Sequence, residues 1–213
     1  TYLDGIPILE FCRLHQDNPQ LLTKLCQSAI RCVCKMIFLD NFVHGDLHPG
    51  NVFVKPDGSK FVLMDFGIVN TYSDHDHQAI INILAAFIRR QGDKAGRLMM
   101  DDSISKGNMA KNQQEYMDKI EHLTRCARTD DYFMESLGSY ISYICEAAAT
   151  HQVLLNPSFV SVALAVKVEE GIALAMDPSV EIPKLAIPII VESERRRYWA
   201  NAVSKLKEYM MFF

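Results

Sequence analysis

The sequence lacks an uninterrupted apolar run long enough to cross a membrane. A spanning helix needs about 18 or more apolar residues, and the longest candidate, residues 159–176, carries Lys167, Glu169 and Glu170 in its middle. The sequence also lacks an excess of positive charge, because 22 Lys and Arg stand against 26 Asp and Glu. The resulting net charge of −4 argues against broad, non-specific binding to nucleic acid, which usually needs a basic face.

Cysteine is too sparse for a secreted scaffold held by disulfides. Six cysteines in 213 residues indicate reduced thiols in a cytosol-like or matrix-like compartment. The chain begins at Thr1 with neither an initiating Met nor a signal pattern, so we expect a piece of a longer protein. With 49% hydrophobic and 23% charged residues, it is predicted to be globular, with one large domain or two small ones.

Helical periodicity dominates the chain. The first expected helix runs from Asn18-Pro19 to about Leu39, and the second from Ser73 to about Arg90, with Gly92 as the stop. After a break at Gly107-Asn108, a third is expected from Met109 to Arg128, and a fourth from a Thr129 cap through Asp130 to Thr150. The fifth runs from Asn156-Pro157 to Met176 and is ended by Asp177-Pro178. The tail that follows is also apolar and then amphipathic, and Pro183 and Pro188 are expected to cut it into pieces.

Only one part of the chain favours strands. Residues 51–54 and 61–64 are short β-type runs, and residues 55–60 between them contain Pro-Asp-Gly. Proline presets φ and glycine tolerates a positive φ, so this connection predicts a hairpin turn. The expected fold class is therefore mainly α, with a small β-hairpin near the front of a helical domain.

Side chains with catalytic potential concentrate around this hairpin. Residues 44–51 (HGDLHPGN) precede it, and Asp65 follows its second strand. A hairpin brings its two ends together, so Asn51 and Asp65 should lie close and present oxygen ligands suited to Mg²⁺. Asp46, upstream on the same loop, is then placed to accept a proton from an attacking hydroxyl or to orient it.

This arrangement matches the catalytic half of a phosphoryl-transfer site. The kinase pattern is H-R-D-x-x-x-x-N followed by D-F-G, and here residues 44–51 are followed by Asp65-Phe66-Gly67. The same residue types are ordinary turn formers, but their order, spacing and strand context together favour the catalytic interpretation. His48 is open between two roles: contact with substrate or phosphate, and holding the loop by a backbone hydrogen bond.

Three other clusters are interpreted as structural. Residues 74–77 (DHDH) are tempting as a zinc site, but alternate helix positions point to different faces, so a solvated first turn is expected. Cys32 and Cys34 have the wrong spacing for a CxxC motif and are expected to pack in the core. Residues 195–197 (RRR) have two interpretations, contact with phosphates or an anionic membrane and a solvated helix face, and we expect the second.

Residues 38–51 together with residues 64–67 resemble the UbiB/aarF-domain atypical kinases. Residues 2–6 (YLDGI) resemble the family's segment just after the hinge between lobes, and residues 89–93 (RRQGD) follow the first long helix as they do in the family. The resemblance covers nearly the whole chain, although its specific motifs occupy only residues 44–67.

The resemblance implies a protein-kinase-like C-lobe over residues 1–213, with the N-lobe missing, that binds ATP and Mg²⁺. Asp46 matches the catalytic Asp, Asn51 and Asp65 match the metal ligands, and His48 is placed with them at the cofactor. The resemblance further implies a link to ubiquinone or other isoprenoid-lipid metabolism, contact with lipid-synthesis enzymes or a peripheral membrane surface, and a mitochondrial location, with cytoplasm and plastid as alternatives.

The chain also departs from the family pattern. Gly45 stands where the family usually has Ala, a change expected to matter little, and no strand Lys or Ala-Pro-Glu motif is present. We therefore expect this chain alone to be inactive, and the family to act on small molecules or as an ATPase. The alternatives are a small-molecule phosphotransferase of the aminoglycoside or choline kinase type and a nucleotide-binding pseudokinase scaffold.

Overall fold

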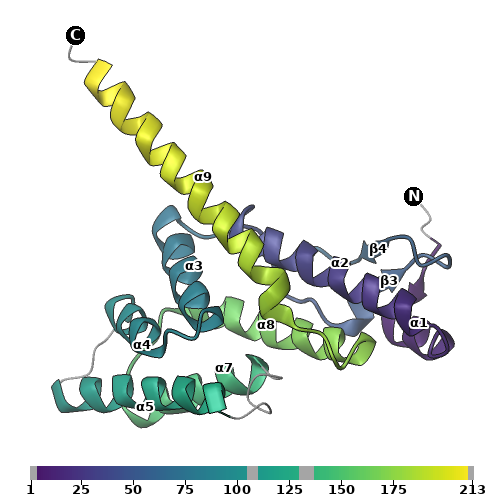
Figure 1. The fold of residues 1–213 in the computed structure, drawn as a ribbon, viewed down its shortest axis with the longest axis horizontal. Coiled ribbons are helices and arrows are strands. Elements are labelled where there is room, and N and C mark those ends of the chain that lie inside the picture. The colour runs from purple at the N-terminus through teal and green to yellow at the C-terminus, as the bar shows by residue number, and fades with distance from the viewer. Residues whose placement is uncertain (1–3, 105–109, 130–136, 211–213) are drawn as a thin grey trace.

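The computed structural model describes residues 4–104, 110–129 and 137–210, and it has the expected mainly helical fold with small antiparallel sheets (Figure 1). Its elements in chain order are β1 (Ile6–Pro7), α1 (Ile8–Leu14), α2 (Pro19–Phe38), β2 (Val43–His44), the 3₁₀ turn η1 (Pro49–Asn51), β3 (Val52–Val54), β4 (Phe61–Leu63), β5 (Val69–Asn70), α3 (Asp74–Ile88), α4 (Gly92–Asp101), α5 (Ala110–Thr129), α7 (Leu137–Thr150), α8 (Pro157–Met176) and α9 (Ile182–Met210).

The predicted hairpin is present. Strands β3 and β4 pair antiparallel, with Val52 opposite Leu63, and Gly58 in the turn has a φ of 70° that favours glycine. Strand β1 adds to the other edge of β3. It contains Ile6, the last residue of the segment that resembles the family's post-hinge region, whereas residues 1–3 lie outside the described part of the chain.

The predicted starts of three helices are confirmed by their caps. The Asn18 side chain accepts a hydrogen bond from the Leu21 amide at the start of α2. Ser73 accepts one from Asp76 at the start of α3. Asn156 likewise accepts one from the Ser158 amide at the start of α8. A side-chain oxygen at each N-cap satisfies an amide that the first turn leaves without a partner, which explains why these starts were readable from sequence.

The region after α3 differs from the prediction. Gly92 does not end a helical stretch but begins α4, and it lies against Thr124 of α5 so closely that a Cβ would overlap that side chain. Thr129 closes α5, although it was expected to cap the next helix. The expected break at residues 107–108 and the start at residue 130 fall outside the described residues.

The prediction that two prolines divide the tail is wrong, because α9 is a single helix. Pro183 lies in its first turn, where the missing N–H has no intrahelical partner to lose, and Pro188 lies inside it. Its buried residues Ala186 and Ile190 flank Pro188, and the helix packs along α2. This packing offsets the hydrogen bond that Pro188 cannot donate.

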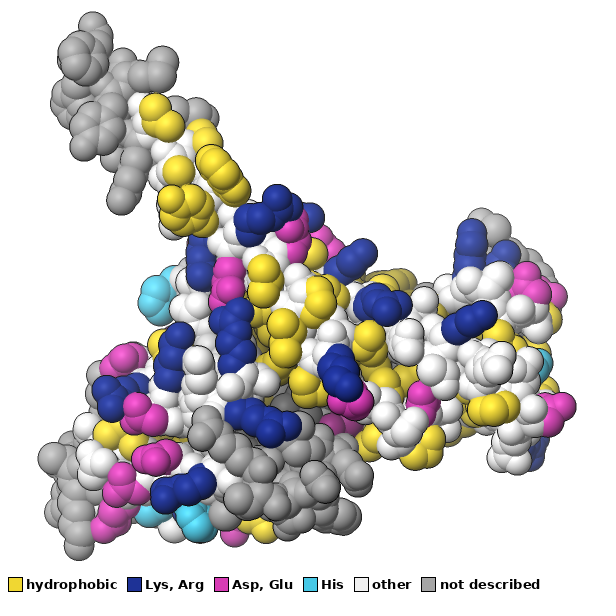
Figure 2. Space-filling view, in the orientation of Figure 1, with side chains coloured by type: hydrophobic (Ala, Val, Ile, Leu, Met, Phe, Trp, Pro, Cys, Tyr) yellow, Lys and Arg dark blue, Asp and Glu magenta, His cyan; other side chains and the backbone are white. Residues whose placement is uncertain are grey.

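Helix α2 lies at the centre of the half of the molecule that carries the hairpin, with α8 and α9 against it (Figure 1). Arg89, just after α3, binds Glu194 of α9 through two hydrogen bonds of 2.7 and 2.8 Å. Beyond this pair α9 projects from the body, and apolar side chains gather on the projecting part (Figure 2). Among the described residues, none of the helices combines the length and apolar character that crossing a membrane requires.

Candidate active site

Two segments of the chain meet beside the hairpin and form the candidate site. Strand β2, at the start of the 44–51 loop, pairs antiparallel with β5, which follows the DFG motif at residues 65–67. The Gly45 amide donates to the Ile68 carbonyl at 2.9 Å. The loop and the DFG motif therefore run side by side, as the hairpin prediction required.

His44 joins these two segments from inside the protein. Its side chain is 1% exposed, Nε2 lies 3.2 Å from the Met64 carbonyl oxygen, and Nδ1 accepts from the Asp46 amide at 3.3 Å. Because Nδ1 acts as an acceptor, Nε2 carries the proton and donates to Met64. The centroid of the Phe66 ring lies 5.1 Å from the centroid of the imidazole. The sequence interpretation gave His44 no role of its own, although its place at the start of the motif was the available signal.

Asn51 is buried and is held in one orientation. Its Nδ2 donates to the Asp46 carbonyl oxygen at 2.9 Å, and its own backbone carbonyl accepts from the Met64 amide at 2.8 Å. The first contact occupies the amide nitrogen, which leaves Oδ1 as the atom able to bind a cation. The second contact places Asn51 next to the residue that precedes Asp65.

Asp65 is exposed and has a φ of 52°, which is uncommon for a residue other than glycine. Its Oδ1 accepts from the Gly67 amide at 3.1 Å, and this short-range bond fixes the carboxylate while its second oxygen remains available. This oxygen and Oδ1 of Asn51 are hard oxygen ligands of the kind that Mg²⁺ prefers, so the two residue types fit a magnesium ion. Their joint coordination of one ion stays a prediction.

Asp46 and His48 lie on the exposed side of the same loop. Oδ2 of Asp46 is 3.9 Å from Nε2 of His48, and His48 Nδ1 accepts from the Gly50 amide at 3.0 Å. The contact with Gly50 is the loop-holding role considered for His48, and the contact with phosphate stays a prediction. The Asp46 carboxylate faces solvent, where a hydroxyl group could reach it.

Gly45 lies close to two side chains of the paired segment. A Cβ built on it would lie 2.6 Å from Cγ2 of Ile68 and 2.9 Å from Nδ2 of Asn70. Alanine at this position therefore requires these two side chains to shift, and Ile68 is 56% exposed. That the change from the family's usual Ala matters little stays a prediction.

The residues at 74–77 do face different ways. His77 hydrogen-bonds through Nε2 with the Ile37 carbonyl at 2.6 Å, whereas His75 and Asp76 approach Asp102 of α4 closely enough to share an ion. Asp76 already accepts hydrogen bonds from Ser73 and Asn156. These bonds, together with the exposure of His75, agree with the solvated first turn.

The other two structural interpretations are confirmed in part. Cys34 is buried, but Cys32 is exposed, so only one of the two packs in the core. Arg195 and Arg196 are solvated and pair with Glu192 of the same helix, as expected for a charged helix face, whereas Arg197 is half-buried and donates to Asn82 of α3.

Comparison with known proteins agrees with the motif. Residues 1–99 match the sequence model of the ABC1 atypical kinase-like domain. This segment, which carries the motif, is similar to the ABC1 atypical kinase-like domain. It is 25% identical to a mitochondrial ABC1 family protein of Saccharomyces cerevisiae, over 90% of this chain and 36% of the relative.

Bacterial ABC1-family relatives show similar coverage. The chain is 24% identical to a probable protein kinase UbiB of Marinobacter nauticus, over 95% of the chain and 37% of the relative. The UbiB of Pseudomonas putida, which has the same description, is also 24% identical, over 93% of the chain and 37% of the relative. The chain thus spans just over a third of the length of these relatives, and the matched ABC1 segment contains the whole candidate site.

Proposed function

We propose that residues 1–213 form the C-lobe of an ATP- and Mg²⁺-dependent atypical kinase or ATPase. The observation that carries this proposal is the position of Asn51, which hydrogen-bonds to the backbone of both Asp46 and Met64. It thereby connects the residue matched to the catalytic base with the residue before Asp65. Metal ligands and catalytic acid–base groups must be held together in this way for phosphoryl transfer.

In this proposal Asn51 and Asp65 would hold Mg²⁺. The bound ion would neutralise charge on the nucleotide phosphates. Asp46 orients the attacking hydroxyl or water and accepts its proton. His48 lies at the cofactor side of the loop and keeps Gly50 in place. His44 does not reach the reactants, since it is buried, and it acts as a positioning residue for both segments.

The wider role follows the family. The mitochondrial yeast relative supports a mitochondrial location, and the bacterial UbiB relatives are compatible with a cytoplasmic one. We place the activity in ubiquinone or other isoprenoid-lipid metabolism, with nucleotide as the ligand of the site and lipid-synthesis enzymes or a membrane surface as partners. Because the chain spans just over a third of the relatives, we expect residues 1–213 alone to bind MgATP weakly and to show no turnover.

The test is binding of the metal–nucleotide complex by the full-length protein. Binding is monitored through the paramagnetic resonance of Mn²⁺ in the presence of ATP. Asp65→Asn should weaken Mn²⁺–ATP binding at least tenfold, because it removes the charge while keeping the oxygen that accepts from Gly67. Asp57→Asn is the matched control. It is also an exposed aspartate in a turn, where it accepts from Ser59, and it should leave binding unchanged.

Equal Mn²⁺–ATP affinity of the Asp65→Asn and Asp57→Asn variants would contradict the assigned metal site. Binding that depends on Asp65 but is never followed by ATP turnover in the full-length protein would favour the scaffold alternative. The two outcomes separate the site from the activity.

A further inference from the structure

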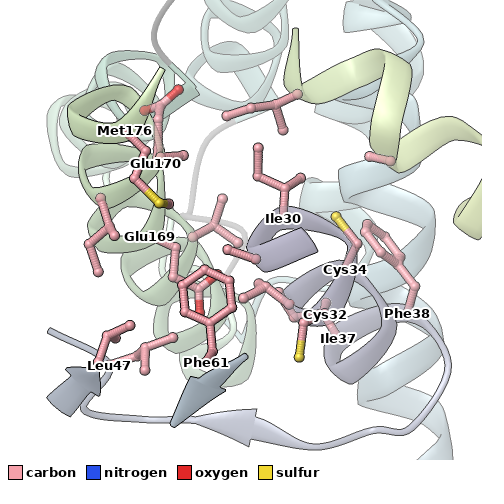
Figure 3. Close-up of a pocket in the computed structure, with 18 of the residues that line it drawn as sticks. Ile30, Cys32, Cys34, Ile37, Phe38, Leu47, Phe61, Glu169, Glu170 and Met176 are labelled. Atoms are coloured by element: carbon pink, nitrogen blue, oxygen red, sulfur yellow. The ribbon is translucent and has the colours of Figure 1, made fainter. Parts of the chain in front are cut away.

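A pocket of about 250 Å³ lies between the hairpin and the helices. Its walls are mostly apolar and come from α2, α3, α8, the hairpin and the first turns of α9, with Ile30, Leu63 and Ile172 among them. Figure 3 shows Phe61 of β4 and Glu169 of α8 on one side of it, with residues of α2 across from them. An apolar cavity does not hold water well, and a cavity smaller than this one can bind a small hydrocarbon.

Two carboxyl groups line this apolar space, those of Glu169 and Glu170. Glu170 is buried and interacts with another residue, whereas Glu169 forms neither a hydrogen bond nor an ion pair within the described part of the chain. Its side chain is half-buried, and its surroundings desolvate the carboxyl. A desolvated polar group without a partner costs free energy and calls for an explanation.

The surroundings of Glu169 determine its charge. Burial raises its pKa to about 8, so the carboxyl is mostly protonated at neutral pH. The nearby titratable groups of α2 are the buried Cys34 and the more exposed Cys32. Loss of water around each thiol raises its pKa most, and the charge of Glu169 raises it further; neither group supplies a positive charge. A protonated carboxyl has one O–H to donate.

We propose that this pocket binds an uncharged, mainly aliphatic molecule whose single hydroxyl or carbonyl oxygen accepts a hydrogen bond from Glu169. The apolar walls would hold the hydrocarbon part, and the carboxyl would select for the oxygen. Nucleotides and sugar phosphates are excluded because the apolar walls cannot solvate their charge. The site is separate from the proposed nucleotide site and does not depend on the proposed function.

The pocket lies next to the segment that carries the candidate active site. Leu47 of the 44–51 loop and Val52 of β3 are part of the wall, and Val52 directly follows Asn51. A bound molecule would therefore pack against the back of the segment that carries the candidate active site. Because it binds only the folded protein, it should raise the melting temperature.

The experiment compares octan-1-ol with octane, using calorimetry and thermal melting of the full-length protein. The wild type should bind octan-1-ol in a saturable way, at least tenfold more tightly than octane, and its melting temperature should rise. Octanoate should not compete at pH 7, where it is charged and Glu169 is mostly protonated. Glu169→Leu should reduce octan-1-ol affinity about tenfold and remove the preference over octane, because the hydrogen bond is lost while the apolar volume stays.

Two further variants complete the test. Ala29→Phe fills the pocket from α2 and should abolish binding of both molecules; Ala29→Leu replaces it if the larger side chain prevents folding. Glu146→Gln, on the exposed face of α7, is the control and should bind as the wild type does. Equal affinity for octan-1-ol and octane, or octan-1-ol affinity unaffected by Glu169→Leu, would overturn the proposal.

Discussion

Nε2 of His44 lies 3.2 Å from the carbonyl oxygen of Met64, so one buried imidazole joins the 44–51 loop to the residue before Asp65. Its other nitrogen accepts from the Asp46 amide. The positions of the catalytic and metal-binding candidates are thereby coupled through a side chain that touches neither reactant. The structure assigns to His44 the task of keeping these segments in register.

Replacing His44 should therefore destabilise the site as well as the fold. In His44→Leu the Met64 carbonyl and the Asp46 amide lose their buried partner, at a cost of about 1–3 kcal/mol in the free energy of unfolding. Amide hydrogen exchange at residues 64–67 should accelerate in the same variant. His75→Leu is the matched control, since that side chain is 85% exposed, and it should change stability by less than about 0.5 kcal/mol.

Asp46 should serve the chemical step more than nucleotide affinity. In the full-length protein, Asp46→Asn should lower turnover on the order of a hundredfold or more, while ATP affinity stays within a few-fold, because a catalytic-loop Asp need not touch the phosphates in the ground state. Steady-state kinetics and equilibrium nucleotide binding measure the two separately. Equal losses in both would reassign Asp46 to binding or folding.

Gly92 should tolerate no side chain. Because a Cβ there would overlap Thr124, Gly92→Ala should lower the free energy of unfolding by about 1–3 kcal/mol, the usual cost of overpacking. Gly171→Ala makes the same change inside α8, where nothing lies within 4 Å of the added Cβ. It should be neutral or stabilise by roughly 0.5–1 kcal/mol. Denaturant unfolding distinguishes the two, and an equal effect of both substitutions on the free energy of unfolding would show that contact with α5 does not limit Gly92.

The pair formed by Arg89 and Glu194 should hold α9 to α3. Its two short hydrogen bonds lower the pKa of Glu194, and a double-mutant cycle with Arg89→Met and Glu194→Gln should give a coupling of about 1 kcal/mol that weakens with salt. Arg97 and Asp93, a more exposed pair within α4, should give about 0.3–0.5 kcal/mol. A coupling no larger than in this control would mean that apolar packing alone fixes α9.

Glu169 should make stability depend on pH. Its folded-state pKa is raised to about 8, so between about pH 5 and 8 the folded protein keeps a proton that the unfolded chain has released. The free energy of unfolding should therefore fall as pH rises through this window, by on the order of 1–4 kcal/mol, and level off above it.

Glu169→Gln should flatten this pH profile, whereas Glu146→Gln should keep it. The Cys32 and Cys34 thiols titrate above the window, since burial raises their pKa values. Parallel profiles for the wild type and Glu169→Gln would rule out this burial.

Local signals in the sequence determined the hairpin, three helix starts and the composition of the site. Caps such as Asn18 and turn residues such as Gly58 act within a few positions of themselves, so their effects can be read without knowing the fold. The spacing of Asp46, Asn51 and Asp65 predicts a shared site for the same reason, since a hairpin returns the chain to where it started.

Only the tertiary structure decided the features that depend on distant residues. From sequence alone Gly92 predicts the end of a helix, but in the structure it packs against Thr124, 32 positions later. Pro188 likewise predicts a helix break, but packing along α2 keeps α9 continuous. The role of His44 and the exposure of Glu169 to an apolar pocket likewise arise from side chains brought together by folding. Propensity and capping energies of about 1 kcal/mol are local properties of the sequence, and packing of distant elements overrides them because it adds many contacts at once.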